Sequence, residues 1–163
     1  MNPLYQIEEK RQQVLDFVNG LNDEDARTKP DENTWSILET LEHLYLIEGW
    51  VTQQLKEALA KEEIQEVREK PVERTVDRSH KVDAPEFLRP KGQFESIEEA
   101  TDSLAKTRDS LLFLIRNYDQ EQLRKRALPH PGFGKMNLEQ WVEFIGYHEL
   151  RHLQQMKEVK NVL

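Results

Sequence analysis

Four stretches of the chain repeat apolar residues at the spacing of an amphipathic helix, and this pattern restricts the fold more than any other feature of the sequence. They cover about residues 4–19, 36–67, 96–118 and 138–158. No strand pattern of comparable strength and no internal repeat accompanies them. Four helices of this length in one small chain predict an all-α fold, a four-helix bundle that forms a single domain over residues 1–163.

Local signals mark the starts of three of these helices. Ser36 and Ser96 are each followed three residues later by glutamate, which makes a capping box whose side chains satisfy the free backbone donors. Asn137 is the expected N-cap of the last helix. The residues before it, over about 127–136, are rich in proline and glycine and predict a loop.

The connection between the second and third helices is unusually long. It runs over about 28 residues, from Arg68 to Glu95, and is interrupted by prolines rather than patterned as a helix. A connection of this length can cross the bundle and lay the third helix parallel to the second. We therefore expect a crossover bundle rather than a simple up-and-down one. The segment also contains apolar side chains that can be buried, which argues against a flexible surface loop; they are Val82, Phe87 and Leu88.

Charge and composition exclude several classes of function. The chain carries 23 Lys and Arg against 31 Asp and Glu, a formal net charge of −8, and has no basic block. Nucleic-acid backbones and anionic membrane surfaces are bound by clustered cations, so we expect neither as a partner. The longest apolar run, residues 111–115, is far shorter than the roughly 20 residues that span a bilayer, and the N-terminus lacks a signal-peptide pattern. These features predict a cytoplasmic protein.

The histidines point to chemistry, because a chain without cysteine has neither a zinc–thiolate site nor a thiol nucleophile. His148 and His152 are four residues apart on a predicted helix, which places both imidazoles on one side, close enough to chelate a divalent ion. Two independently hydrogen-bonded histidines are the alternative. His43, at the edge of the apolar face of the second helix, is the best-placed third ligand. His80 and His130 fall in predicted loops, and we expect both to be solvated.

The segment from His148 to His152 also matches H-E-x-x-H, the zinc-binding motif of many metallopeptidases. In those enzymes the glutamate is the general base, and a further ligand comes from downstream. Only a short segment follows His152, without the G-x-x-H extension, and no strand is predicted that would align a peptide. The sequence therefore argues against peptidase activity.

Two glutamates fall near the centres of inward-facing helix surfaces. They are Glu48 in the second helix and Glu149 in the fourth. Buried carboxylates are costly unless they are paired or hydrogen-bonded. One hypothesis makes them a proton acceptor beside the metal or an orienting partner of the ligating imidazoles. The other makes them a structural polar pair between helices, and the sequence alone does not separate the two.

Five short motifs occur in order along the chain: Thr34-Trp35-Ser36, Leu41-Glu42-His43-Leu44, Lys81-Val82-Asp83-Ala84-Pro85-Glu86, Arg89-Pro90-Lys91-Gly92 and His148-x₃-His152-Leu153-Gln154-Gln155. In this order and spacing the chain resembles the DinB family, and the third and fourth motifs resemble its YfiT-type branch. The resemblance covers nearly the whole chain.

This resemblance implies a four-helix bundle of up-down-down-up topology with one divalent ion, often nickel or zinc, on three histidines. The positions that match the ligands are His43, His148 and His152, and Gln155 matches a glutamine often seen after the last histidine. Members are frequently homodimers. Their activities include thiol-dependent transferases and isomerases, with bacillithiol, mycothiol or glutathione as co-substrate, and hydrolases.

The resemblance and the residues together leave three functions open for this chain. The first is a metal-dependent transferase that uses a low-molecular-weight thiol and acts on a small molecule. The second is a metal-dependent hydrolase of a small substrate. The third is a bundle that binds a metal or ligand without catalysis.

Overall fold

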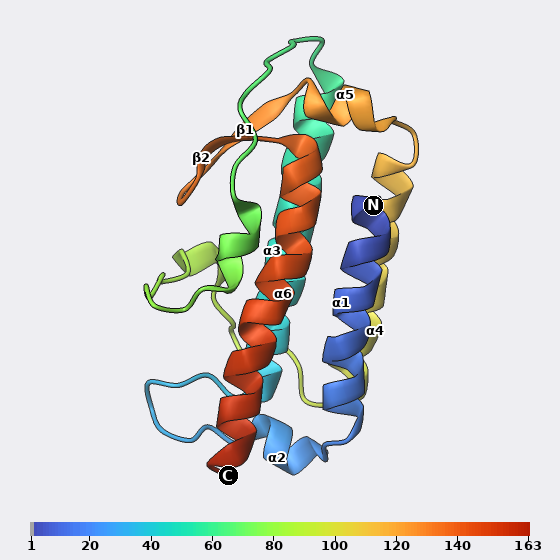
Figure 1. Cartoon of the computed structure of the whole chain (residues 1–163). Helices are drawn as coiled ribbons and strands as arrows, with labels where there is room; N and C mark the ends of the chain where they lie inside the picture. Colours follow the sequence, from blue (N-terminus) through green and yellow to red (C-terminus); the bar gives the residue numbers. More distant parts are fainter. Residues whose placement is uncertain (1) are drawn as a thin grey trace.

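The computed structural model describes residues 2–163 and confirms the four-helix bundle. Its long helices are α1 (Pro3–Asn19), α3 (Ile37–Ala60), α4 (Ile97–Ile115) and α6 (Leu138–Asn161). In Figure 1, α1 and α6 run downwards while α3 and α4 run upwards. The two middle helices are therefore parallel, which is the up-down-down-up order that the family resemblance implied.

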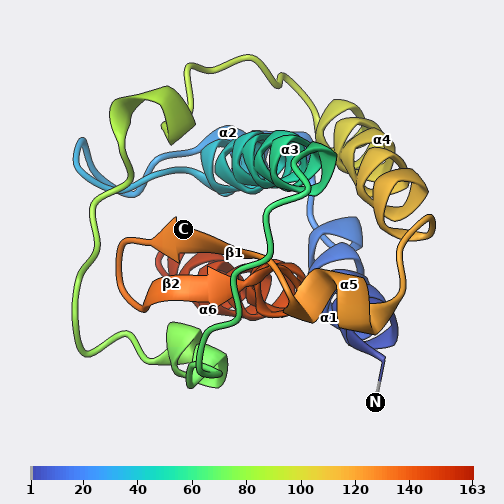
Figure 2. The ribbon, with the colours of Figure 1, turned by 90° about the horizontal axis from the view of Figure 1, so that it is seen from above.

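The connection between α3 and α4 wraps around one side of the bundle. It carries two single-turn 3₁₀ helices, η1 (Val72–Val76) and η2 (Glu86–Leu88). Figure 2 shows α1 beside α6 in one layer and α3 beside α4 in the other. In this view the connection passes from the end of α3 to the outer side of α6, then back past α3 to the start of α4. It therefore spans the seam between α3 and α6.

The apolar residues of this connection are only partly buried, contrary to our expectation. Leu88 is 4% exposed, but Val82 is 73% exposed and Phe87 is 55% exposed. The Phe87 ring still rests on Trp50 of α3, with 5.7 Å between ring centroids. The segment lies over the surface of the bundle, so of these three side chains only that of Leu88 is buried.

The helix α3 ends at Ala60, about two turns before the predicted end at residue 67. Lys61 adopts an extended conformation, and the backbone N–H of Gln65 then donates to the carbonyl of Lys125, 2.7 Å away. Three glutamates follow within six residues, and negative charge is unfavourable at the carboxyl end of a helix. No basic side chain in the last turn compensates for them.

The predicted loop before the last helix is instead a β-hairpin, so the expectation of no strands was wrong here. Strands β1 (Ala127–His130) and β2 (Gly134–Asn137) pair antiparallel, with His130 opposite Gly134. Strands of four residues are too short to show the alternation that identifies a strand in sequence. The hairpin, with the short helix α5 (Gln120–Arg124) before it, links α4 to α6 across one end of the bundle.

Two apolar clusters fill the bundle, one towards each end. Large buried members of the first are Ile7, Leu55, Leu111, Trp141 and Ile145, and of the second Val14, Leu41, Leu104, Leu153 and Met156. Between them each long helix contributes one buried charged residue: Arg11, Glu48, Arg108 and Glu149. Among the described residues, no helix is both long enough and apolar enough to cross a bilayer.

Candidate metal site

The fold brings the three predicted ligands together, one from α3 and two from α6. The Nε2 atom of His148 lies 3.3 Å from Nε2 of His43 and 3.1 Å from Nε2 of His152. One ligand atom from each ring lies within 4.8 Å of the other two. All three side chains are buried. The helical spacing of His148 and His152 aligns their rings, and the packing of α3 against α6 adds His43.

The hydrogen bonds at the far sides of two rings determine where their protons lie. Nδ1 of His43 is 2.7 Å from the carbonyl oxygen of Leu88, and a carbonyl only accepts, so Nδ1 carries the hydrogen. Nδ1 of His152 likewise donates to Oε1 of Gln155 at 2.6 Å. Both Nε2 atoms therefore present lone pairs towards His148. These partners also fix the two rings in the orientation that a metal ligand needs.

The proton count then leaves one nitrogen unsatisfied. His148 has at most one hydrogen on Nε2, which satisfies only one of the two lone pairs that face it. Its Nδ1 atom is buried and has no hydrogen-bond partner. A cation among the three Nε2 atoms satisfies all three lone pairs at once. Zinc–nitrogen bonds of about 2.0–2.1 Å in a tetrahedral site place nitrogens roughly 3.3 Å apart, close to the observed separations.

The environment keeps all three rings neutral, the form that binds a metal. Burial is the main cause that lowers the pKa of His43, and it lowers the pKa of His148 well below its ordinary value. Burial, together with the neighbouring His43, lowers the pKa of His152 to about 3. Because the imidazoles stay uncharged at neutral pH, no protons compete with an ion for their lone pairs.

Aromatic rings enclose the histidines. The Trp35 ring centroid lies 5.1 Å from that of His43 and 6.4 Å from that of His152, and Phe144 lies 5.3 Å from His148. Trp141 is buried, whereas Trp35 is half-buried at the edge of the site. The role of Trp35 was missed because its contact depends on the loop that precedes α3.

Glu48 and Glu149 face away from the histidines, towards two buried arginines. Arg11 donates to Oε1 of Glu149 at 2.7 Å and to Oε1 of Glu48 at 2.9 Å. Arg108 donates to Oε2 of Glu48 at 2.7 Å and to Oε1 of Glu149 at 3.2 Å. Thr107 completes the contacts of Glu48. This geometry favours the structural hypothesis for both glutamates, since the hydrogen bonds that they accept come from Arg11, Arg108 and Thr107 and none comes from a histidine of the site; Oε2 of Glu149 accepts none.

Sequence reasoning missed Arg11 and Arg108, although a signal for both was present. Each stands on an apolar helix face, Arg11 between Ile7 and Val14 and Arg108 between Leu104 and Leu111. A cation in the centre of an apolar face needs a buried anion. The inward-facing glutamates were the available partners.

The two remaining histidines differ from each other. His80 is exposed, as expected. His130 is half-buried in β1, so its predicted solvation was wrong; its ring packs 4.6 Å from Phe144 and 5.0 Å from Trp141, measured between centroids. Burial lowers the pKa of His130 to about 4. The hairpin places this ring against α6, and no strand pattern in the sequence indicated that placement.

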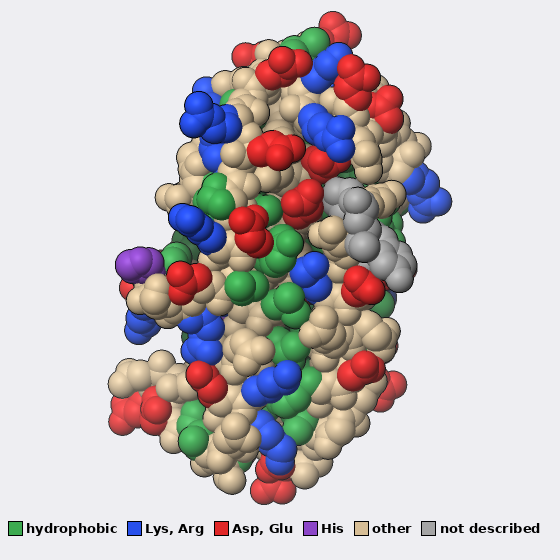
Figure 3. Space-filling view, viewed as in Figure 1, with side chains coloured by type: hydrophobic (Ala, Val, Ile, Leu, Met, Phe, Trp, Pro, Cys, Tyr) green, Lys and Arg blue, Asp and Glu red, His purple; other side chains and the backbone are tan. Residues whose placement is uncertain are grey.

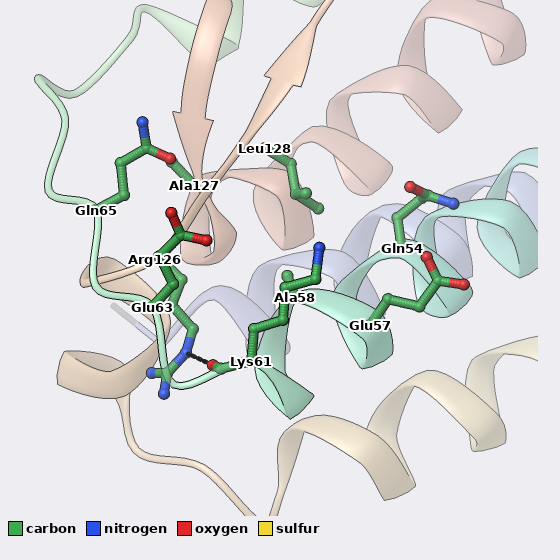
Figure 4. A pocket seen from close by; sticks show the side chains of 9 residues that line it. All are labelled: Gln54, Glu57, Ala58, Lys61, Glu63, Gln65, Arg126, Ala127 and Leu128. Carbon is green, nitrogen blue, oxygen red and sulfur yellow. Dashed lines mark hydrogen bonds between the residues drawn. The ribbon is translucent and has the colours of Figure 1, made fainter.

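Two small hollows elsewhere on the surface do not include the histidines. Figure 4 shows the first, about 140 Å³, where the end of α3 meets the hairpin and Arg126 donates to the carbonyl of Lys61. The second, about 230 Å³, lies at the start of α3 beside Arg27 and Phe94. On the face in Figure 3, acidic and basic side chains are interspersed, and neither sign is concentrated in one area.

Comparisons with known proteins agree with this arrangement. The family model described as the DinB superfamily matches residues 6–156. The chain is 40% identical over 152 residues to YuaE of Bacillus subtilis (strain 168), a protein named as uncharacterized, and the match covers 93% of each chain.

Two solved structures share the fold. YfiT from Bacillus subtilis, described as "a probable metal-dependent hydrolase with an unusual four-helix bundle topology", superposes with a TM-score of 0.67 at 16% identity, over 98% of this chain and 84% of YfiT. TT2238, described as a four-helix bundle protein, superposes with a TM-score of 0.62 at 22% identity, over 96% of both chains.

Proposed function

The chain belongs to the DinB superfamily, and from this premise we propose that it is a metal-dependent transferase that joins a low-molecular-weight thiol to a small electrophile. One divalent ion, zinc or nickel, is held by His43, His148 and His152. The observation that carries the proposal is the convergence of three Nε2 atoms that have at most one hydrogen among them. Neutral, buried rings with two fixed Nδ1 donors are suited to a divalent cation and to little else.

The donor set supports thiol chemistry. A divalent ion on three neutral imidazoles keeps its charge uncompensated and lowers the pKa of a coordinated thiol or water. The chain has no cysteine, so the thiol is a co-substrate. Its sulfur forms a bond to the electrophilic carbon, the leaving group departs with the bonding pair, and the thiol proton passes to solvent.

The absence of a nearby base favours a thiol over water as the nucleophile. Within residues 2–163, no carboxylate joins the three-histidine cluster, and Glu48 and Glu149 are engaged with arginines. A free thiol ionises near pH 8.5 and therefore needs less assistance than water. The same placement of Glu149 gives no support to a peptidase mechanism, in which that glutamate is the base.

Hydrolysis of a small substrate is the second candidate. It is favoured by the structural match to YfiT, which is described as a probable metal-dependent hydrolase. In that case water replaces the thiol at the same three histidines. A bundle that only binds a metal or ligand is the remaining alternative.

The first experiment measures metal content and turnover together. Protein purified without chelator is analysed for zinc and nickel, then mixed with 1-chloro-2,4-dinitrobenzene, with and without bacillithiol or glutathione. We expect about one ion per chain and chloride release that needs both thiol and metal. His148→Ala should abolish both, and His80→Ala, the matched control, should change neither.

The other outcomes separate the alternatives. Metal-dependent cleavage of p-nitrophenyl acetate without thiol, and no conjugation, would replace the transferase with the hydrolase. A bound ion with neither reaction would favour the binding bundle. No zinc or nickel after supplementation would contradict both enzyme functions and leave only a bundle that binds a ligand other than a metal.

A further inference from the structure

Several side chains of α6 hold the connection between α3 and α4, and Arg151 makes the most hydrogen bonds to it. Arg151 donates through Nη1 to the carbonyl oxygens of Thr75, at 3.1 Å, and Asp77, at 2.6 Å, and through Nη2 to the carbonyl of His80, at 3.0 Å. We call residues 75–93 the bridge. Three carbonyls on one guanidinium fix the path of its first part, because the planar fork restricts where each acceptor can lie.

The other end of the bridge is tied to α3 by Glu42. The backbone N–H of Lys91 donates to its Oε2 at 2.6 Å, and those of Gly92 and Gln93 donate to its Oε1 at 3.0 Å each. Glu42 is only 2% exposed. Successive N–H groups that converge on one anion form a nest, and the bend that points them inward requires Gly92 to adopt a positive φ of 79°.

Both ties come from residues that directly precede a histidine of the site. Glu42 precedes His43, and Arg151 precedes His152. Between the ties, Leu88 of the bridge offers the carbonyl that accepts from Nδ1 of His43. The bridge therefore touches the metal site itself, although residues 81–87 between the ties lie mostly at the surface.

We propose that Glu42 and Arg151 are positioning residues that hold the bridge over the three histidines, so that order in the bridge and metal affinity are thermodynamically linked. The proposal rests on the proposed function only in that a divalent ion binds. The bridge keeps the Leu88 carbonyl in place, the carbonyl keeps the hydrogen of His43 on Nδ1, and Nε2 thus remains a lone pair for the ion. By reciprocity, an ion that fixes His43 also stabilises the bridge.

A substitution at Arg151 distinguishes this proposal from a purely electrostatic effect of its charge on the metal. Its positive charge repels a divalent cation held by the neighbouring His152, so its removal by Arg151→Gln should strengthen metal binding if charge alone matters. If Arg151 acts through the bridge, the same substitution weakens binding, despite the loss of a repulsive charge. The sign of the change is therefore the readout.

Two glycines provide a matched pair that leaves the charges unchanged. Gly92 and Gly134 both have positive φ, 79° and 73°, and an added Cβ would meet no atom within 4 Å at either position. Gly92→Ala and Gly134→Ala therefore introduce similar backbone strain, one in the bridge and one in the hairpin. Only the first should alter the metal site, although Gly92 contacts none of the histidines in hydrogen bonds.

The experiment measures zinc affinity by competition with a chromophoric chelator, and hydrogen exchange in peptides that cover residues 75–93. We expect Arg151→Gln, Glu42→Gln and Gly92→Ala each to weaken zinc binding by about tenfold or more. Zinc should slow exchange in the bridge of the parent protein and do so less in the variants. Gly134→Ala should match the parent in both measurements.

The contrary outcomes are distinct. If the parent binds zinc while Arg151→Gln binds it equally or more tightly and Gly92→Ala binds it equally, the linkage is wrong and the metal site stands. Exchange in the bridge that is unaffected by zinc leads to the same conclusion. A parent protein that binds no zinc would overturn the proposed function and the linkage together. If Glu42→Gln fails to fold, the other variants still decide the question.

Discussion

Two polar clusters lie side by side in the bundle, and consecutive residues of α6 belong to different ones. His148 faces His43 and His152, whereas Glu149 faces Arg11 and Arg108. The charged cluster contains two cations and two anions whose charges compensate one another, although Oε2 of Glu149 is buried without a hydrogen-bond partner. The histidine cluster contains three neutral rings whose lone pairs converge without enough hydrogens. The arginines account for the burial of the two glutamates, whereas no neighbouring side chain accounts for the converging lone pairs of the three histidines, and a bound cation would do so.

The positions of the clusters agree with this distinction. The charged cluster draws one residue from each of the four long helices and lies between the two apolar halves of the core. The histidine cluster uses only α3 and α6 and lies beneath the bridge. Replacing parts of the first should therefore affect folding, and replacing parts of the second should affect binding.

The largest expected effect is on the charged cluster. Arg108→Met removes a cation that contacts both Glu48 and Glu149, and leaves two buried carboxylates with a single arginine. We expect the free energy of unfolding in urea to fall by about 3–5 kcal/mol. The double variant Arg108→Met/Glu48→Leu keeps one balanced pair and should recover part of this loss. A loss below about 1 kcal/mol would show that charge balance is unimportant here.

The second-largest expected effect is on the histidine cluster. His148→Ala should weaken zinc binding by more than about 100-fold, since it removes one of three ligands. It should cost the metal-free protein less stability than Arg108→Met, because it also removes a buried nitrogen that lacks a partner. Isothermal titration and urea unfolding measure the two effects. His43→Ala and His152→Ala should behave alike, and His80→Ala and His130→Ala should bind zinc as the parent does.

Lowering the pH should destabilise the histidine cluster in a defined range. The folded pKa of His152 is about 3 and that of His130 about 4, against about 6.5 in an unfolded chain. Below pH 6.5 the unfolded chain binds protons that the folded chain does not, so the stability of the metal-free protein falls from pH 6.5 to about 4 through His130 and to about 3 through His152. Because the ligating rings of the folded chain stay neutral well below pH 6.5, zinc should be retained at pH 5 and released as the pH approaches 3.

The measurement is urea unfolding of metal-free protein at pH 7.5, 6, 5 and 4, with His152→Ala for comparison. The carboxylates contribute equally to both proteins, so the variant should lose less stability over this range. Equal pH dependence of parent and variant would contradict the low folded pKa of His152.

The smallest expected effect concerns the residue that joins the clusters. Glu149→Gln removes a charge from the arginine side and should lower the free energy of unfolding by about 1–3 kcal/mol. In cobalt-substituted protein, the pH at which an added thiol produces a sulfur-to-metal absorption band should stay unchanged. A shift of that pH would support the alternative hypothesis, in which Glu149 accepts a proton near the metal, and would show that the charged cluster affects the chemistry of the histidine cluster.

The sequence predicted the parts of this molecule that depend on local spacing. The capping box at Ser36, the helical repeat of apolar residues and the pair His148 and His152 are all set within a few residues; the box predicted at Ser96 forms only in its serine half, because the Glu99 carboxylate accepts from the backbone of Glu95 instead. The Glu39 carboxylate indeed bonds the backbone of Ser36, and each of the two serines accepts from the backbone three residues on. Helix periodicity also put His43 on the correct side of its helix.

The parts that the sequence did not predict depend on contacts between distant segments. Leu88 orients His43 from 45 residues away, and Arg11 reaches Glu149 over 138 residues. Trp35 and the hairpin contribute through loop paths that no periodicity describes. The bridge was recognised as a crossover from its length, but its ties to Glu42 and Arg151 use backbone groups, which have no signature in the residue types.

The separation of 105 residues between His43 and His148 also bears on how the chain folds. During synthesis α3 emerges long before α6, and among the described residues the other two histidines of the cluster, His148 and His152, both lie on α6. Before α6 packs, α3 offers a single imidazole, and one such ligand binds an ion too weakly to retain it. Contacts of such long sequence separation form late, because the entropy of closing the intervening chain must be lost first. An ion at the proposed site would therefore be retained only after the last helix has docked.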